Sequence, residues 1–85
     1  MTLEQLGLRA GEAVRWRPKE GARWAEGKVT AVERDGSVGL TDRQGRARAL
    51  PIDRLEVRAS GPRGARTWEP LAERAARTEQ MELFS

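Results

Sequence analysis

Residues 23–41 read R-W-A-E-G-K-V-T-A-V-E-R-D-G-S-V-G-L-T, and this segment contains the strongest hairpin signal of the chain. Two runs containing valine flank the dipeptide Asp35-Gly36. Asp-Gly readily adopts the positive φ angles that a tight hairpin turn requires. We therefore predict an antiparallel hairpin with strands over residues 23–34 and 37–41, in which Gly27 allows a bend or bulge.

Further short strands are predicted on both sides of this hairpin. Residues 13–17 alternate, so that Val14 and Trp16 share one face and arginines the other. A fourth strand over residues 46–51, a helical turn over 52–54 and a fifth strand over 55–58 follow. Five short strands with tight turns predict a small, strongly bent barrel that hides its strand edges. The predicted core is Leu6, Leu8, Val14, Trp16, Val29, Val32, Val38, Leu40, Leu50, Ile52, Leu55 and Val57.

Three segments of this region carry a family resemblance: G-E-A-V-R-W at 11–16, R-W-A-E-G-K-V-T-A-V at 23–32 and A-L-P-I-D-R-L-E-V at 49–57. Together they make residues 11–58 resemble a Tudor-type or KOW-type SH3-like barrel. The resemblance covers somewhat more than half of the chain and implies a mainly β fold with a small five-stranded SH3-like barrel. It does not imply one function, because a fold can carry many.

The segments outside the barrel are predicted from local signals. Within residues 1–10, Thr2 and Gln5 have the spacing of a capping box, and Gly7 is expected to end the short turn or helix that follows. Residues 59–66 are rich in glycine and proline and are predicted to be a linker. Thr67 suits a helix N-cap, so a short helix is predicted over residues 67–79, with Trp68, Leu71, Ala72, Ala75 and Ala76 along one stripe.

Residues 80–84 read Q-M-E-L-F and place two large apolar side chains at the end of the given sequence. Leaving them exposed forgoes burial worth about 1.5–3 kcal/mol each, which favours a receptor for them. The pattern resembles the sliding-clamp-binding motif of bacterial replication and repair proteins, commonly Q-L-[SD]-L-F. The resemblance implies that residues 80–85 dock on the clamp: Gln80 by hydrogen bonds, and Met81, Leu83 and Phe84 by burial in an apolar cleft. The alternative is an intramolecular clasp that buries Leu83 and Phe84 on their own domain.

The composition argues against catalysis. The 85 residues include no cysteine and no histidine, and tyrosine is also absent. The commonest general base and the thiolate and imidazole metal ligands are therefore missing. We predict a non-enzymatic protein with no cofactor, no metal site and no small-molecule substrate. No apolar run is long enough to span a bilayer, so a cytoplasmic location and no membrane partner are expected.

A basic surface is the second candidate site. The net charge is +3, and 14 of the 16 basic residues are arginine, which suits bidentate phosphate recognition. Interleaved acidic residues could instead neutralise this surface. Trp24 falls outside the clear alternation, so it either stacks on a partner or plugs one end of the barrel. The candidate residues for contact with nucleic acid or another partner are Arg15, Arg17, Arg23, Trp24, Lys28, Arg43, Arg46 and Arg48.

These observations favour an adaptor of bacterial DNA replication or repair. Its C-terminal peptide would dock on the DNA sliding clamp, and its barrel would contact DNA or another replication or repair protein. Tethering two weak contacts in one chain makes the second contact intramolecular and strengthens the whole. The alternative is a barrel that binds RNA or the transcription machinery, such as RNA polymerase, with the tail as a clasp.

Overall fold

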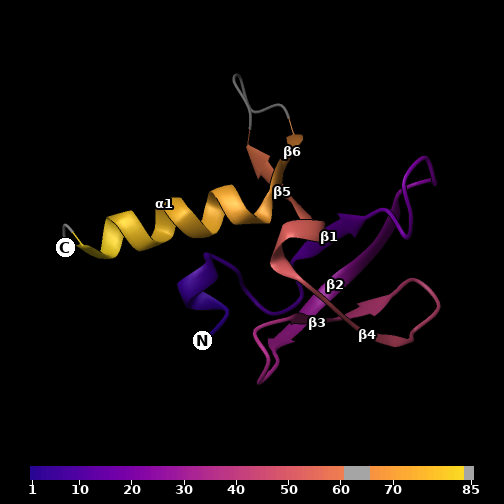
Figure 1. The fold of residues 1–85 in the computed structure, drawn as a ribbon, viewed down its shortest axis with the longest axis horizontal. Coiled ribbons are helices and arrows are strands. Elements are labelled where there is room, and N and C mark those ends of the chain that lie inside the picture. Colours follow the sequence, from indigo (N-terminus) through magenta and orange to yellow (C-terminus); the bar gives the residue numbers. More distant parts are fainter. Residues whose placement is uncertain (61–65, 84–85) are drawn as a thin grey trace.

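The computed structural model describes residues 1–60 and 66–83 and shows a mainly β domain with a C-terminal helix (Figure 1). Two short 3-10 helices, η1 (Glu4–Leu6) and η2 (Ile52–Arg54), accompany the sheet. The helix α1 spans Leu71–Leu83. The strands within the described residues are β1 (Ala13–Trp16), β2 (Ala25–Val32), β3 (Val38–Asp42), β4 (Ala47–Leu50), β5 (Glu56–Ser60) and β6 (Arg66–Pro70).

The strands form one antiparallel sheet in the order β4-β3-β2-β1-β5-β6. The sequence predicted five strands closed into a barrel. Across the described residues the sheet instead has six strands, and its outer strands β4 and β6 do not pair with each other. The physical reason is that β5 is an interior strand, bonded to β1 on one side and to β6 on the other.

The β2–β3 hairpin forms where it was predicted. Gly36 has a φ of 89° in the turn, and its N–H donates to the carbonyl of Glu33 at 3.0 Å. The bulge lies between Val29 and Ala31, however, and not at Gly27. Gly27 has a different reason to be glycine, because a Cβ there would lie 2.5 Å from the carbonyl oxygen of Thr41. The residue therefore permits a close approach of the two strands.

The segment after β5 differs from the prediction. Ala59 and Arg66, at the two ends of the expected linker, lie in paired strands, while residues 61–65 are outside the described residues. Thr67 is opposite Ala59 in the sheet and does not cap a helix. The helix begins only at Leu71, because pairing with β5 holds the preceding residues in an extended conformation.

The hydrophobic core largely matches the prediction. Nine of the predicted positions are fully buried, and Val32, Leu50 and Ile52 are partly buried against them. Leu71, at the start of α1, is an addition with no exposed surface. The fully buried set is Leu6, Leu8, Val14, Trp16, Val29, Val38, Leu40, Leu55, Val57 and Leu71.

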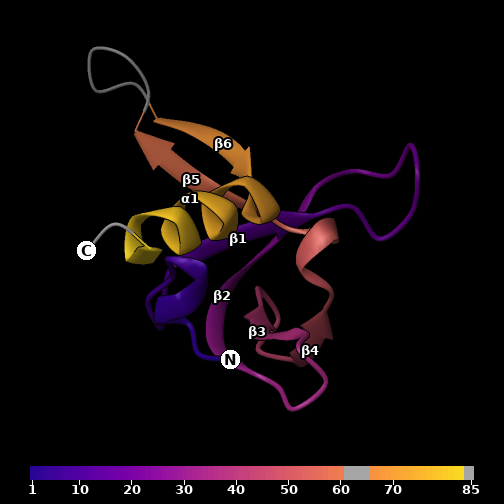
Figure 2. The ribbon, with the colours of Figure 1, turned by 60° about the vertical axis from the view of Figure 1, so that its left-hand side comes forward.

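Helix α1 packs beside η1, with its far end directed away from β3 and β4 (Figures 1 and 2). The backbone N–H of Leu71 donates to the carbonyl of Leu55 at 2.9 Å, and Ala75 contacts the core. The predicted capping box is present, since Thr2 and Gln5 exchange hydrogen bonds of 2.9 and 3.3 Å. None of the helices within the described residues is long and apolar enough to cross a membrane.

Arg74 joins α1 to the sheet and to the N-terminal segment. Its guanidinium pairs with Glu12 before β1 and with Glu69 on β6, the latter at 2.9 Å. It also donates to the carbonyls of Gly7 and Arg58. Burial on its own would lower the pKa of Arg74, but the hydrogen bonds to the two carboxylates outweigh it and raise that pKa. Arg74 therefore stays charged and fixes the first turns of the helix.

Candidate functional site

Three arginines and two tryptophans are linked by close cation–π contacts on the face of the sheet that lies away from the core. The Cζ atom of Arg15 lies 4.0 Å from the ring centroid of Trp24 and 4.7 Å from that of Trp68. Arg17 lies over Trp24 at 4.5 Å, and Arg58 lies over Trp68 at 5.3 Å. We call these residues the Arg–Trp stack; the contacts link them in the order Arg17, Trp24, Arg15, Trp68 and Arg58.

Strand register explains why the stack forms. Because Val14 and Trp16 are buried, the residue between them on β1 points to the opposite face. There Arg15 is directly opposite Glu56 on β5, and two residues further along β5 Arg58 is opposite Trp68 on β6. Side chains directly opposite each other in a sheet lie on the same face and interact. The sheet thus brings together groups that are more than 40 residues apart in sequence.

The loop between β1 and β2 supplies the other end of the stack. Trp24 immediately precedes β2, whose first residue is paired with Trp16. Trp24 is 37% exposed. Arg54 donates through Nη2 to the carbonyls of Arg17 and Pro18, at 2.7 and 3.1 Å. These hydrogen bonds tie the start of the loop to η2. The loop carries both Arg17 and Trp24, which contact each other in the stack.

Charge in the stack is concentrated at its two ends. The central Arg15, 23% exposed, forms an ion pair with Glu56 at 2.6 Å. Arg17 and Arg58 are exposed, and neither forms an ion pair with a carboxylate of the described part of the chain. The two terminal guanidiniums can therefore donate hydrogen bonds to an anionic ligand.

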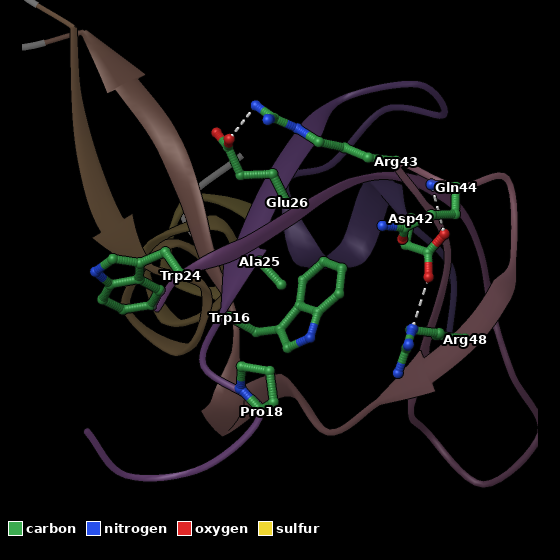
Figure 3. Close-up of a pocket in the computed structure, with 9 residues that line it drawn as sticks. All are labelled: Trp16, Pro18, Trp24, Ala25, Glu26, Asp42, Arg43, Gln44 and Arg48. Carbon is green, nitrogen blue, oxygen red and sulfur yellow. Dashed lines mark hydrogen bonds and ion pairs between the residues drawn. The ribbon is translucent and has the colours of Figure 1, made fainter. Parts of the chain in front are cut away.

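A pocket of about 300 Å³ lies between the buried Trp16 and the exposed Trp24 on one side and the turn after β3 on the other (Figure 3). Its positive side chains are already paired: Arg43 with Glu26, and Arg48 with Asp42 at 2.9 Å. The lining is completed by aromatic, small and polar side chains. The pocket residues are Trp16, Pro18, Trp24, Ala25, Glu26, Asp42, Arg43, Gln44 and Arg48.

Asp42 organises the turn beside this pocket. It is the one charged residue that is buried within the described residues. Its Oδ1 accepts the backbone N–H groups of Gln44 and Arg46, at 3.0 and 2.9 Å, and its Oδ2 accepts Nε of Arg48. The hydrogen bond from Arg48, aided by the one from Arg46, lowers the pKa of Asp42 below its ordinary value of 3.8. This carboxylate is thus a structural acceptor that keeps its charge.

The predicted basic residues fall into separate groups. Arg15, Arg17 and Trp24 come together in the stack, whereas Arg43 and Arg48 line the pocket as ion-paired groups. Lys28 lines a second hollow together with Arg43 and Arg58. Arg23 and Arg46 are exposed, the first next to Trp24 and the second in the turn before β4. The predicted basic residues therefore do not form one continuous positive surface, and only Arg15 and Arg17 among them belong to the Arg–Trp stack.

Three members of the site were missed by sequence reasoning: Glu56, Arg58 and Trp68. Trp68 was assigned to the predicted helix, so its place beside Arg58 was not considered. The available signal was the segment Arg66-Thr67-Trp68, which contains two residues favoured in strands. From this segment a sixth strand could have been predicted, but not which residues of β5 it would pair with.

Three of the four predicted clamp-binding residues, Gln80, Met81 and Leu83, lie in the last turn of α1. The helix continues through Leu83, and Gln80 is exposed on it. Phe84 lies outside the described residues, as do the side chains of Met81 and Leu83. The structure therefore gives the backbone position of residues 80–83 and the exposure of Gln80.

No group of three or more acidic side chains in the described ranges, 1–60 and 66–83, could hold a metal ion. Comparisons with protein families, with curated proteins and with solved structures found no match to this chain. The functional argument therefore depends on the residues themselves.

Proposed function

We propose that this chain is a non-enzymatic adaptor of bacterial DNA replication or repair. Gln80, Met81, Leu83 and Phe84 dock on the DNA sliding clamp, and the sheet contacts DNA or another replication or repair protein through its Arg–Trp stack. The proposal keeps the two sites apart: a peptide for the clamp and a folded surface for the second partner.

The position of the Q-M-E-L-F segment carries this proposal. Leu71 and Arg74 anchor the first turns of α1, while Gln80 is exposed near its far end. Helix ends fray more easily than helix centres, so a receptor can unwind the last turn at small cost. A helix whose first turns are anchored and whose last turn can unwind is suited to present residues 80–84 as a docking peptide.

We also propose that residues 11–58 are related to the Tudor-type and KOW-type SH3-like barrels. The strand order β5-β1-β2-β3-β4 within the larger sheet supports this relation. So does the helical turn η2, which directly precedes β5. On this interpretation, β6 and α1 extend a barrel-like unit and cover its side.

Clamp docking is tested with purified bacterial sliding clamp. Fluorescence anisotropy of a labelled peptide covering residues 76–85, and titration of the full chain, should both show binding. Leu83→Ala with Phe84→Ala should weaken it by at least about tenfold, because such apolar anchors dominate peptide affinity. Glu79→Ala, one residue before the motif, is the matched control and should bind as the wild type does. Failure of both the peptide and the full chain to bind would refute the docking proposal.

A second candidate function follows from the chemistry of the stack. Arginine planes and indoles also suit RNA, whose unpaired bases stack on such groups. The chain would then act on RNA or with RNA polymerase, and the tail would be a clasp. A ¹⁹F label on Phe84 separates the two cases: a signal broadened and shifted in the free protein indicates a clasp, and a sharp signal at the free-peptide position indicates docking.

A further inference from the structure

Arg17 and Arg58, at the two ends of the Arg–Trp stack, can each both stack on a ligand and donate hydrogen bonds to it. Arg15 lies over two indoles, but Arg17 lies over Trp24 alone and Arg58 over Trp68 alone among the residues that the structure describes. Both arginines are exposed, so a ligand can reach the planar guanidinium of each. Its N–H groups point outward in the plane and remain free to donate. Each end therefore offers a flat cationic face and a fork of donors.

The interior of the stack fixes these ends in place. Arg15 is held between Trp24 and Trp68 and is also paired with Glu56. Because each terminal guanidinium lies on an indole that the central arginine also contacts, its orientation is restricted before any ligand binds. Preorganised side chains lose less conformational entropy on binding.

Single-stranded nucleic acid matches this arrangement. It supplies rings that stack on a guanidinium plane and phosphates that accept its N–H groups. Duplex DNA supplies the phosphates but keeps its base faces stacked inside the helix. An acidic peptide supplies carboxylates without regularly spaced rings. Arg23, which directly precedes Trp24 in the sequence, is exposed and adds a further positive charge to this loop.

We infer that the Arg–Trp stack is a binding site for single-stranded nucleic acid, in which bases extend the stack at Arg17 and Arg58 and phosphates bind the guanidinium edges. This inference deepens the DNA contact of the proposed function and rests on it. Clamp docking uses other residues, so the two can be tested separately in the same chain.

The test measures binding of the full chain to labelled oligothymidine and oligouridine of about 20 nucleotides, and to a duplex of equal length. Binding is followed by anisotropy and by quenching of tryptophan fluorescence over about 50 to 200 mM salt. We expect the single strands to bind at least about tenfold more tightly than the duplex. A preference for oligouridine over oligothymidine would assign the strand to RNA and favour the second candidate function.

Three variants separate stacking from charge. Arg17→Gln with Arg58→Gln should weaken binding by about 10- to 100-fold and reduce the salt slope by about 1.4, the value for two lost phosphate contacts on a single strand. Arg17→Lys with Arg58→Lys keeps both charges but loses the planes, so it should weaken binding by about three- to tenfold with the salt slope unchanged. Arg34→Gln, an exposed arginine in the β2–β3 turn, removes the same kind of charge elsewhere and should bind within about twofold of the wild type.

Several outcomes would overturn the inference. These are no binding to either single strand at low salt, duplex binding as tight as single-strand binding, or a lysine variant indistinguishable from the wild type. Competition by polyglutamate as effective per charge as oligothymidine would also overturn it. Leu83→Ala with Phe84→Ala should leave strand binding unchanged, and the glutamine variant should still bind the clamp. Loss of one activity without the other therefore identifies which proposal has failed. Circular dichroism of each variant checks that it is folded.

Discussion

Arg15 stacks on Trp24, with the guanidinium carbon 4.0 Å from the centre of the indole ring. The pair joins a residue of β1 to the loop that precedes β2, and Arg15 also contacts Trp68 and Glu56. The same arginine thus holds three segments of the outer face together. Its role differs from that of Arg17, whose guanidinium lies over one ring, Trp24, and forms no ion pair with a carboxylate among the described residues.

Replacing the central arginine should destabilise the domain more than replacing the terminal one. Arg15→Ala removes two cation–π contacts, worth about 0.5–1 kcal/mol each, and a partly exposed ion pair worth at most about 1 kcal/mol. We expect the free energy of unfolding to fall by about 1–3 kcal/mol in urea titration. Arg17→Ala should lower it by less than about 1 kcal/mol. Equal losses in the two variants would show that the stack does not hold the outer face together.

Arg74 should contribute more to stability than its neighbour Arg77. Both arginines pair with Glu69, but the side chain of Arg74 is 16% exposed and that of Arg77 is 59% exposed. Arg74→Ala also leaves Glu12 without its ion-pair partner and should cost about 2–3 kcal/mol. Arg77→Ala should cost at most about 1 kcal/mol, because solvent screens an exposed pair. Thermal unfolding of the two variants provides the comparison, and a larger loss for Arg77→Ala would contradict the assignment.

Replacing Gly7 by alanine should destabilise the domain more than the same replacement of Gly45. Its φ is 74°, and a Cβ built there would lie 2.5 Å from Oγ1 of Thr78 on α1. Gly7→Ala combines left-handed strain with displacement of the Thr78 hydroxyl, which donates to the carbonyl of Arg74, so a loss of about 1.5–3 kcal/mol is expected. Gly45 has a φ of 83° and open space around it. Gly45→Ala therefore reports the backbone strain alone, about 1 kcal/mol, and an equal loss in both variants would show that the contact with Thr78 adds no cost.

Features with a local cause could be predicted from the sequence. The hairpin at Asp35-Gly36 depends on one dipeptide, and the capping box depends on Thr2 and Gln5. Alternation in β1 correctly placed Val14 and Trp16 in the core. In each case neighbouring residues determine the backbone, so distant contacts were not needed.

The sixth strand and the stack could not be predicted in the same way. Thr67 followed by Glu69 and Pro70 fits the start of a helix, and only pairing with β5 makes the segment a strand. Trp68 was therefore assigned to a helical stripe. Its contact with Arg15 depends on the register of β1, β5 and β6 together. Alternation placed Arg15 on the outer face but carried no information about what it would meet there.

Asp42 should make stability depend on pH in the acid range. Its pKa in the folded protein lies below its ordinary value of 3.8, chiefly because Arg48 donates a hydrogen bond to it. A carboxyl group with a lowered folded pKa stabilises the protein above the unfolded pKa, and this stabilisation is lost as pH falls through the folded pKa. Wild type should therefore be more stable than Asp42→Asn at about pH 6, and the difference should shrink below about pH 3.8. Urea titration of both proteins at each pH measures this difference in the free energy of unfolding.

Arg48→Gln should move the loss of stability to higher pH, because the main cause of the lowered pKa of Asp42 is gone. Asp53→Asn, at an exposed position on η2, should leave the wild-type profile unchanged. A difference between wild type and Asp42→Asn that stays constant from neutral to acid pH would show that this carboxylate gains nothing from Arg48 and the turn around it.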